Sequence, residues 1–261
     1  MHIFLMLLLS GLYQSEFPDK NMPFYSENIL NIDSVMHEFC KPGDHLPKQD
    51  VIFLDQRHGS AVIQIDRSSS NSKLSVSGDS IFSVESCSVG LVTADCIPIL
   101  VASTNESFVG AIHAGWKGLK DDIIANSINA YREAGVSISH LAFAMGPCIH
   151  KCCFEVGHSL MEEVQLRHGH LWKHSAPPWS KFRNLRSFSF KKNLACGSTD
   201  SYWFDLSAYT KILLLDSGVA LSQLREVPNC TYCSPDRLGS FRRRNHNFEP
   251  VSFQRSWIGH I

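Results

Sequence analysis

A long apolar run with two polar residues near its middle constrains this chain more than any other feature. Residues 89–101 read VGLVTADCIPILV, and a run of this kind is typical of a buried β-strand. A buried strand tolerates Asp95 and Cys96 only where other groups satisfy them. Residues 107–112 return as a second strand after a turn, so we predict a hairpin. The hairpin would bring Cys96 and His113 to the same end or edge of one sheet.

The remaining pattern alternates strands with helices, and several neighbouring strands look like hairpins, which favours an α+β fold with mixed sheets. An apolar stripe predicts a helix over 119–134, with Asp121 and Asp122 in its first turn and Gly135 as its stop. Ser makes up seven of the fourteen residues in 67–80, which we interpret as a flexible loop. The other expected elements are one or two strands in 51–65, a strand at 141–149, a helix at 156–166, a last helix at 206–217 and a final strand at 251–258.

The composition is compatible with one domain in a reducing compartment. The chain has 261 residues, 44% of them hydrophobic, which is enough to bury a sizeable core. A formal net charge of -1 gives no general attraction to nucleic acid or to anionic membranes. Nine cysteines, an odd number in a chain of this size, do not resemble a secreted disulfide scaffold. We therefore expect reduced thiols and a cytoplasmic location.

The N-terminus carries an apolar run at 3–9 that is too short to cross a bilayer and lacks the flanking features of a signal peptide. We expect 1–21 to be an appendage, either disordered or untranslated, and 22–261 to form the folded domain.

Segment 167–199 contains seven Lys or Arg residues and no acidic residue. One interpretation is a basic, aromatic lid that grips phosphate or nucleic acid. The other, which we favour, is a variable surface insertion whose aromatic side chains pack onto the domain. The aromatic residues concerned are Trp172, Trp179, Phe182, Phe188 and Phe190.

Three short strings place a metal-ligating side chain beside small residues: QRHG at 56–59, TADC at 93–96 and AIHAGW at 111–116. Zinc binds Cys thiolate and neutral His nitrogen, and a catalytic zinc keeps three protein ligands and one open position. His58, Cys96 and His113 form such a set, although thirteen histidines and nine cysteines allow many triplets.

The chain carries four ordered motifs: TADCIPIL, AIHAGWKGL, GPCIHKCCFEVG and a tail in which CT precedes SFRRR. In their order and spacing they resemble the YfiH family, strongly over about 50–165 and more loosely over 200–261. This family is labelled multicopper polyphenol oxidase or laccase-like, and its members are described as purine nucleoside phosphorylases. The resemblance implies a single catalytic domain in which two sheets are layered with helices, α/β/β/α-like.

The resemblance also implies that His58, Cys96 and His113 hold one catalytic zinc ion per chain, with Cu²⁺ the less favoured metal. It implies phosphorolysis of adenosine, inosine and S-methyl-5′-thioadenosine, together with adenosine deamination. Purine nucleosides and phosphate are then the expected partners. Zinc lowers the pKa of a bound water to roughly 7, which is compatible with deamination at C6 of adenine.

Five further residues are candidates for the substrate site. Asp95 and Glu155 are possible acid–base groups. Asp95 could instead orient a metal ligand, and Glu155 could instead satisfy backbone donors at a helix start. Arg242 and Arg243 suit forked recognition of phosphate oxygens, unless they form a solvated charged run. Lys41 is the nearest counterpart of an Arg that the family usually has near the N-terminus.

Three other functions stay open. The same metal could serve a hydrolase that edits an amide in a cell-wall precursor. A copper-dependent polyphenol oxidase would need many His-x-His pairs, whereas His168 and His170 form the only such pair in the chain. A metal-stabilised binding protein without catalysis is the third.

The CxxC pair formed by Cys230 and Cys233 could be a second metal site or a redox pair. No second CxxC accompanies it in the sequence. We therefore favour neither role, and we interpret the adjacent Cys152 and Cys153 as packing residues.

Overall fold

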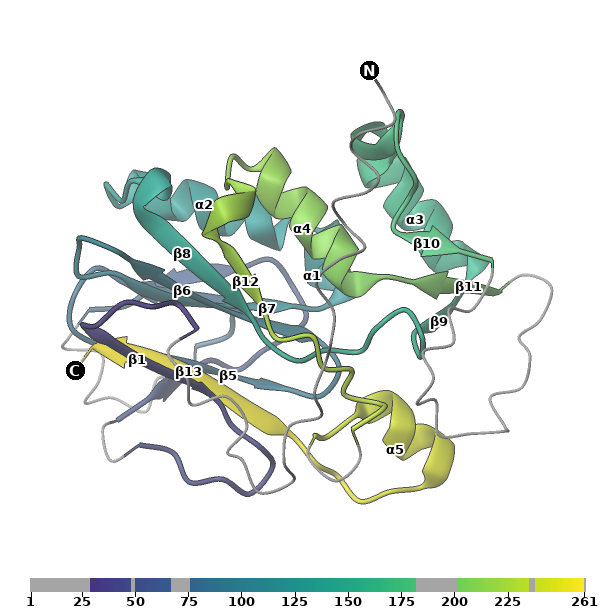
Figure 1. Ribbon diagram of the computed structural model, residues 1–261, viewed down its shortest axis with the longest axis horizontal. Helices are drawn as coiled ribbons and strands as arrows, with labels where there is room; N and C mark the ends of the chain where they lie inside the picture. Colours follow the sequence, from purple (N-terminus) through teal and green to yellow (C-terminus); the bar gives the residue numbers. More distant parts are fainter. Residues whose placement is uncertain (1–28, 48–49, 67–75, 182–200, 235–237, 261) are drawn as a thin grey trace, which may run out of the picture.

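Two β-sheets pack face to face, and helices cover the outer face of the larger sheet (Figure 1). The structure is a computed structural model that describes residues 29–47, 50–66, 76–181, 201–234 and 238–260. The mixed α+β arrangement in a single domain confirms the predicted fold class. The expected appendage at 1–21 lies outside the described residues.

The smaller sheet has four strands in the order β1–β13–β5–β2. Its pairs are antiparallel except for β2 with β5, which run parallel. The last strand of the chain, β13, is therefore held between β1 and β5, away from a sheet edge. The strands are β1 (Val35–Phe39), β2 (Ile52–Phe53), β5 (Ser88–Thr93) and β13 (Gln254–His260).

The larger sheet has six strands in the order β12–β8–β6–β7–β4–β3. The inner pairs are antiparallel, and the two outer pairs, β12 with β8 and β3 with β4, run parallel. Pairing of β6 with β7 confirms the predicted hairpin. The strands are β3 (Val62–Gln64), β4 (Ser80–Ser83), β6 (Ile97–Ser103), β7 (Val109–Ala114), β8 (Leu141–Met145) and β12 (Leu224–Glu226).

We predicted one strand for the apolar run at 89–101, but the run forms two strands. Its first half is β5 in the four-stranded sheet, and its second half is β6 in the six-stranded sheet. The chain turns from one sheet to the other at Asp95, whose φ of 89° lies in the left-handed region. The polar residues that interrupt the run therefore sit in the connection between the sheets.

Strand β6 is buried on both faces, which explains its nearly continuous apolar sequence. Ile97, Ile99 and Val101 belong to the core between the sheet and the helices. Leu100 and Ala102 belong to the second core, between the two sheets. Successive side chains of a strand point to opposite faces, so one strand supplies both cores.

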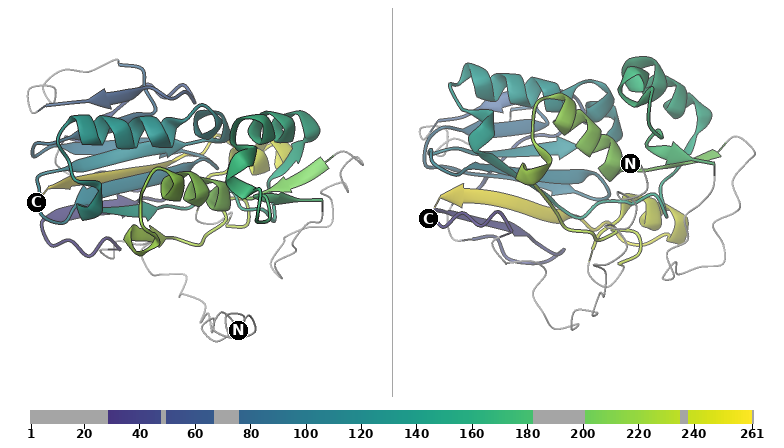
Figure 2. Two further views of the ribbon diagram at one scale, coloured as in Figure 1. Left: turned by 90° about the horizontal axis from the view of Figure 1, so that it is seen from above. Right: turned by 45° about the horizontal axis from the view of Figure 1, so that its top comes forward.

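The helices α1, α2 and α4 lie on the outer face of the six-stranded sheet, with α3 beside them, and the right-hand view of Figure 2 shows them gathered on one side of the stacked sheets. Helix α5 lies apart from them, at the end of the sheets where β13 begins (Figure 1). The helices are α1 (Trp116–Lys120), α2 (Ile123–Glu133), α3 (His158–His168), α4 (Leu206–Asp216) and α5 (Phe241–Asn247), with 3₁₀ turns at Ile138–His140, Gly169–Trp172 and Leu221–Gln223. None of the described helices is long and apolar enough to cross a bilayer.

Two helix predictions need correction. The helix predicted over 119–134 is split into α1 and α2, because Asp122 has a φ of 67°, which interrupts the helical backbone. Gly135, with a φ of 83°, does end α2 as expected. The tail was predicted to contain no helix after 217, yet α5 forms there, and its start is capped by the side chain of Ser240.

A third sheet of three short strands, ordered β10–β11–β9, flanks α3. It comprises β9 (Glu155–Gly157), β10 (Trp179–Ser180) and β11 (Ser201–Phe204). Trp172 is buried, and its ring centroid lies 5.3 Å from that of Trp179. The described part of segment 167–199 thus packs onto the domain, while Phe182, Phe188 and Phe190 lie outside the described residues.

Candidate functional site

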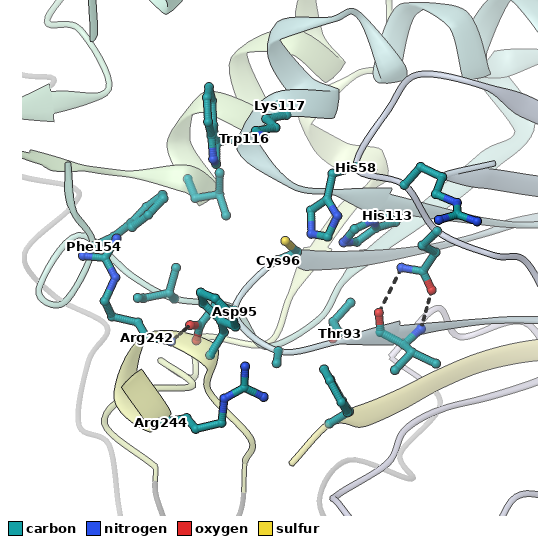
Figure 3. A pocket seen from close by; sticks show the side chains of 18 of the residues that line it. His58, Thr93, Asp95, Cys96, His113, Trp116, Lys117, Phe154, Arg242 and Arg244 are labelled. Carbon is teal, nitrogen blue, oxygen red and sulfur yellow. Dashed lines mark hydrogen bonds between the residues drawn. The ribbon is translucent and has the colours of Figure 1, made fainter. Parts of the chain in front are cut away.

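Three side chains from separate segments meet at one end of the six-stranded sheet. His58 lies in the loop after β2, Cys96 immediately precedes β6, and His113 lies on β7. The register of β6 and β7 pairs Pro98 with His113, so Cys96 and His113 share a sheet end as predicted. The ligand atoms of the three residues all lie within 4.8 Å of one another (Figure 3).

This donor set fits a zinc ion. One thiolate and two imidazoles are ligands that zinc accepts, at about 2.3 Å from sulfur and about 2.0–2.1 Å from nitrogen. His113 is buried, whereas His58 is exposed and lines a pocket. Three protein ligands beside an open pocket are typical of a catalytic zinc, because a structural zinc has four.

Asp79 is a buried carboxylate that orients two of the three residues. Its Oδ1 accepts a hydrogen bond from the backbone N–H of His58 at 2.8 Å and lies 2.8 Å from Nδ1 of His113. Its Oδ2 accepts from the backbone N–H groups of Gly59 at 2.7 Å and Arg57 at 3.2 Å. The bond at Nδ1 leaves Nε2 of His113 available to a metal.

Sequence analysis missed Asp79 because it assigned the whole of 67–80 to a flexible loop. The end of that segment is ordered: Ser80 begins β4, and the N–H of Asp79 donates to the carbonyl of Ala61 at 3.0 Å. The available signal was an acidic residue two positions before the apolar pair Ile81 and Phe82, which belongs to a strand that begins at Ser80. Residues 67–75 lie outside the described ranges.

Charges within the cluster shift the pKa values of the two less exposed donors. Burial alone would raise the pKa of the Cys96 thiol, but hydrogen bonds with His113 and His58, and the charge of both rings, lower it to about 7. Burial would lower the pKa of His113, but hydrogen bonds with Asp79 and Cys96 raise it to about 9. The thiolate that zinc requires is therefore accessible at neutral pH.

The AIHAGW motif contributes a glycine that leaves room for the ligands. A Cβ atom on Gly115 would lie 2.9 Å from Sγ of Cys96 and 3.3 Å from Cδ2 of His58. Any larger residue would push the sulfur or the ring aside. The glycine at position 115 therefore has a steric reason.

The loop that carries His58 is bonded to both sheets. The side-chain amide of Gln56 donates to the carbonyl of Val92 at 2.9 Å and accepts from the N–H of Val92 at 2.8 Å (Figure 3). The side chain thus makes the two hydrogen bonds with Val92 that the backbone of a neighbouring strand would otherwise make at the end of β5. Two residues later, His58 is bonded through its backbone to Asp79, directly before β4 of the other sheet.

The three donors open onto a pocket of about 720 Å³, a size usual for small-molecule sites. Figure 3 shows Trp116, Phe154, Arg242 and Arg244 on one side of it, opposite the donors. The lining residues are Leu54, Asp55, Gln56, Arg57, His58, Val92, Thr93, Ala94, Asp95, Cys96, His113, Trp116, Lys117, Ile149, Phe154, Leu206, Phe241, Arg242, Arg244 and Phe253.

Asp95 lines the pocket beside Cys96, and its carboxylate is held by two groups. Oδ1 accepts a hydrogen bond from Oγ1 of Thr231 at 2.5 Å, and Oδ2 accepts from the backbone N–H of Arg242 at 2.7 Å, in the first turn of α5. Burial raises the pKa of Asp95, although these hydrogen bonds oppose the rise. The hydrogen bond to a ligand imidazole is made by Asp79 and not by Asp95.

Two predicted residues do not line the pocket. Glu155 lies on β9 and not at a helix start, and its backbone carbonyl accepts a hydrogen bond from Nη1 of Arg242 at 2.7 Å. Lys41 follows β1, and its backbone N–H donates to Oδ2 of Asp44 at 2.6 Å. The geometry therefore gives no support to Glu155 as an acid–base group or to Lys41 as a phosphate ligand.

Only one of the two arginines predicted to bind phosphate lies at the pocket. Arg242 lines the pocket, and its guanidinium lies 5.4 Å from the ring centroid of Phe154. Arg243 is buried instead, and it donates to Glu249 and to the carbonyls of three residues in the preceding loop, Thr231, Tyr232 and Leu238. Arg244, which sequence analysis did not select, lines the pocket in its place.

His168, the first residue of the His-x-His pair, is not an open copper ligand. Nδ1 of His168 lies 2.6 Å from the hydroxyl of Tyr209, and Nε2 lies 2.9 Å from Oδ1 of Asp122. Both ring nitrogens of His168 are thus engaged within the protein.

Comparison with known proteins identifies the family of this chain. A family model described as multi-copper polyphenol oxidoreductase laccase matches residues 31–248. This chain belongs to that family. The resemblance to the laccase-like YfiH family that the four motifs predicted is thereby confirmed.

Relatives in the laccase-like family bear enzyme names. The chain is 29% identical over 228 residues to a purine nucleoside phosphorylase of Rickettsia conorii, covering 86% of this chain and 84% of that protein. It is 28% identical over 159 residues to adenosine deaminase RL5 from an unknown prokaryotic organism, covering 61% and 54% respectively. Its fold matches the crystal structure of YlmD from Geobacillus stearothermophilus with a TM-score of 0.66 at 23% identity, over 82% of this chain and 74% of that one.

Proposed function

We propose that this chain is a zinc-dependent enzyme acting on purine nucleosides: a phosphorylase for adenosine, inosine and S-methyl-5′-thioadenosine that also deaminates adenosine. The observation that carries the proposal is the convergence of His58, Cys96 and His113 at the wall of a pocket of about 720 Å³. The names of the relatives support the choice of purine nucleosides as the substrate class.

His58, Cys96 and His113 would hold the metal, with Asp79 fixing the ring of His113 and the backbone of His58. When bound, zinc supplies a Lewis acid and lowers the pKa of a coordinated water to roughly 7. The surrounding side chains would bind and orient the nucleoside and phosphate and would move the protons.

Aromatic side chains suit a purine base. Trp116, Phe154, Phe241 and Phe253 all line the pocket, and a purine ring stacks favourably on such rings. Phe241 and Phe253 are about half exposed, at 51% and 47%, so they leave apolar surface for a ligand to cover. Burial of that surface would favour nucleoside binding.

Arg242 and Arg244 suit phosphate. Both guanidinium groups reach the pocket from α5, and a guanidinium binds phosphate oxygens with paired hydrogen bonds. Among the described residues Arg244 makes no ion pair, so no carboxylate of these residues competes with phosphate for its guanidinium group. Lys117 lines the same pocket and adds a further positive charge.

Asp95 is the acid–base candidate that we retain. It lines the pocket and its pKa is raised by burial, so its carboxyl group is better able to carry a proton than an exposed Asp. Replacement by Asn tests this role, because Asn tolerates the positive φ at this position and still accepts the hydrogen bond from Thr231. Its amide nitrogen cannot accept the hydrogen bond from the backbone N–H of Arg242, so an unchanged KM for inosine and phosphate is needed to show that α5 has kept its position. We expect Asp95→Asn to retain zinc and to lose turnover by about 10²-fold or more.

The function is tested with zinc-loaded protein and a panel of inosine, adenosine and S-methyl-5′-thioadenosine, with and without phosphate. Free base should appear from inosine only when phosphate is present.

Cys96→Ala should lose both the pocket metal and turnover, while Cys87→Ser, which alters a buried thiol in the core between the sheets, should retain both. Arg244→Met should raise the KM for phosphate about tenfold, corresponding to about 1.4 kcal/mol, with little change in the KM for inosine.

Zinc-loaded wild-type protein that leaves all three nucleosides unchanged would contradict the proposal. A nucleotide-sugar-linked amide belongs in the same panel, because its cleavage would favour the hydrolase alternative.

A further inference from the structure

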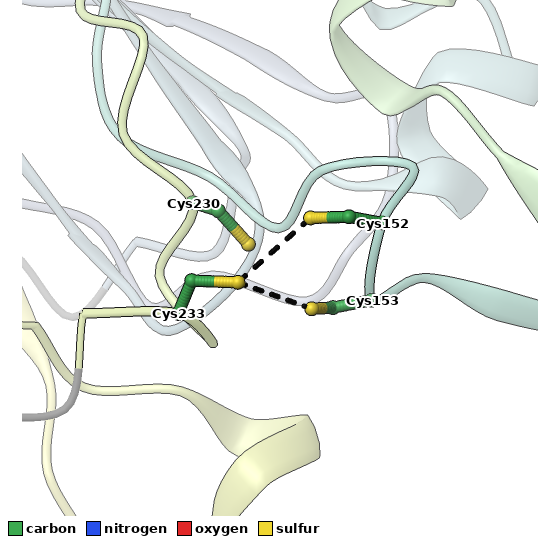
Figure 4. Close-up of side chains that lie close together, drawn as sticks. All are labelled: Cys152, Cys153, Cys230 and Cys233. Atoms are coloured by element: carbon green, nitrogen blue, oxygen red, sulfur yellow. Dashed lines mark hydrogen bonds between the residues drawn. The ribbon is translucent and has the colours of Figure 1, made fainter. Parts of the chain in front are cut away.

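Four cysteines from two distant segments lie together outside the pocket. Cys152 and Cys153 belong to a turn before β9, and Cys230 and Cys233 belong to a turn after β12. Their sulfur atoms all lie within 4.8 Å of one another (Figure 4). Sequence analysis favoured neither a metal nor a redox role for the CxxC pair because the sequence contains no second CxxC, but the fold brings the adjacent pair Cys152 and Cys153 to it.

The sulfur positions suit a tetrahedral ion. Zinc–sulfur bonds of about 2.3 Å place the sulfurs of a tetrahedral site about 3.8 Å apart. Sγ of Cys233 lies 3.8 Å from Sγ of Cys152 and 3.4 Å from Sγ of Cys153. Figure 4 shows the four side chains pointing toward a common centre. Modest shifts would bring all four sulfurs to bonding distance from one ion.

The environment is that of a closed site. Cys152, Cys153 and Cys230 are buried, and Cys233 is partly buried. Four sulfur ligands saturate a tetrahedral zinc ion and leave no open position, unlike the three donors at the pocket. Thiolate ligands select zinc over magnesium, calcium or manganese, which prefer oxygen.

We propose that Cys152, Cys153, Cys230 and Cys233 bind a second, structural zinc ion. Each thiol gives up its proton as it becomes a ligand, so binding replaces up to four protons by one divalent cation. No electron transfer is involved.

The ion would fasten the segment that carries α5 to the segment that carries the pocket wall. Phe154, next to Cys153, lines the pocket, and Thr231, next to Cys230, donates to Asp95. The same two segments are already joined by a backbone hydrogen bond from Thr231 to the carbonyl of Cys148 at 2.9 Å. A metal at this point would fix the position of α5, which carries Arg242 and Arg244.

The buried side chain of Arg243 holds the CxxC turn in place. It donates to the carbonyls of Thr231 and Tyr232 at 2.6 Å and 3.2 Å, which lie between the two cysteines of the CxxC turn. Because Arg243 also forms an ion pair with Glu249 at 2.8 Å, its contribution is to order this turn and not to neutralise the site.

The test uses full-length Cys96→Ala protein, in which the pocket site is disabled, supplied with zinc under reducing conditions. We expect about one zinc per chain, and X-ray absorption should show four sulfur neighbours at about 2.3 Å and no nitrogen neighbours. Wild-type protein should hold about two zinc ions per chain. This arm leaves the four cysteines intact, so it does not depend on whether a cysteine variant folds.

The reciprocal variant is Cys233→Ser, at the most accessible of the four positions. It should retain about one zinc ion, with mixed sulfur and nitrogen ligands. Addition of a chelator should lower its thermal stability less than it lowers that of the wild type, because the four-cysteine site is already without metal. Cys87→Ser is the matched control and should retain two zinc ions.

Three results would overturn the proposal: Cys96→Ala protein that takes up no zinc, a bound iron–sulfur cluster in place of zinc, or a disulfide between the two segments found by peptide mapping without reduction. Because the readout is metal content and ligand type in a variant without the pocket metal, it is independent of nucleoside turnover.

Discussion

Oδ1 of Asp79 lies 2.8 Å from Nδ1 of His113, and the two side chains are almost completely buried, at 1% and 2% exposure. A carboxylate bonded to the second nitrogen of a ligand imidazole fixes the tautomer and the direction of the ring, and it increases the basicity of the ligand nitrogen. Asp79 also accepts hydrogen bonds from the backbone of His58 and Gly59, so one side chain positions two ligands that lie 55 residues apart.

Asp79→Asn should weaken zinc binding at the pocket by about 10- to 100-fold, because the negative charge behind His113 is lost. Competition with a chromogenic chelator measures the affinity. Asp216→Asn, which alters an exposed acid at the end of α4, serves as the control and should bind zinc like the wild type. Equal affinities for the two variants would show that Asp79 does not support the site.

Gly115→Ala should reduce zinc affinity at the pocket by roughly tenfold or more, because a misplaced ligand cannot reach bonding distance. The added Cβ would lie 2.9 Å from Sγ of Cys96. Gly157→Ala is a matched control, because nothing lies within 4 Å of a Cβ at that position. Metal content after dialysis, measured for both variants, decides the outcome.

Arg243→Met should lower the stability of the protein, whereas Arg244→Met should affect phosphate binding and leave stability almost unchanged. Removal of the buried Arg243 guanidinium leaves three carbonyls and Glu249 without their donor, which should cost about 3 kcal/mol of unfolding free energy. Arg244→Met should change stability by no more than about 0.5 kcal/mol. Urea unfolding at neutral pH measures both, and similar losses for the two variants would contradict the assignment.

His37 should make the protein sensitive to mild acid. The imidazole is buried on β1, neither ring nitrogen has a hydrogen-bond partner among the described residues, and burial lowers its pKa from 6.5 to about 4. Between these values the unfolded chain binds a proton that the folded chain does not. The stability that neutral His37 contributes is therefore complete above about pH 6.5 and is lost as the pH falls toward 4.

From about pH 7.5 to pH 5, this difference should remove about 2 kcal/mol of unfolding free energy from the wild type. Over the same pH interval, the unfolding free energy of His37→Phe should fall by about 2 kcal/mol less than that of the wild type. His174→Phe, at an exposed position, should behave like the wild type. Urea unfolding at the two pH values provides the comparison.

Sequence reasoning succeeded where partners are close in the chain or where a motif marks them. The β6–β7 hairpin follows from two apolar segments separated by a short turn, and it brings Cys96 to His113 without further information. His58 was selected as the ligating residue of the string QRHG, and the family resemblance then favoured its triplet with Cys96 and His113 over the many others that the sequence allows. In contrast, Asp79 reaches His113 only because β4 lies beside β7, and no local pattern encodes that pairing.

The same limit explains the errors at the C-terminal end. The sequence SFRRR does not reveal which arginine faces the protein, because α5 was not predicted and its orientation depends on the hydrogen bond from Arg242 to Asp95. The four cysteines likewise meet only through the tertiary fold, since about eighty residues separate the two pairs.

Gln56 has a consequence for how the protein responds to its ligands. Its amide attaches the His58 loop to Val92 in one sheet, while Asp79 attaches the same loop to the other. Metal binding at the pocket and the packing of the two sheets against each other are then thermodynamically coupled. The free energy by which metal binding stabilises the packing equals the free energy by which the packing strengthens metal binding. Breaking the link between Gln56 and Val92, for example with Gln56→Ala, should consequently raise the metal dissociation constant, although neither residue is a metal ligand.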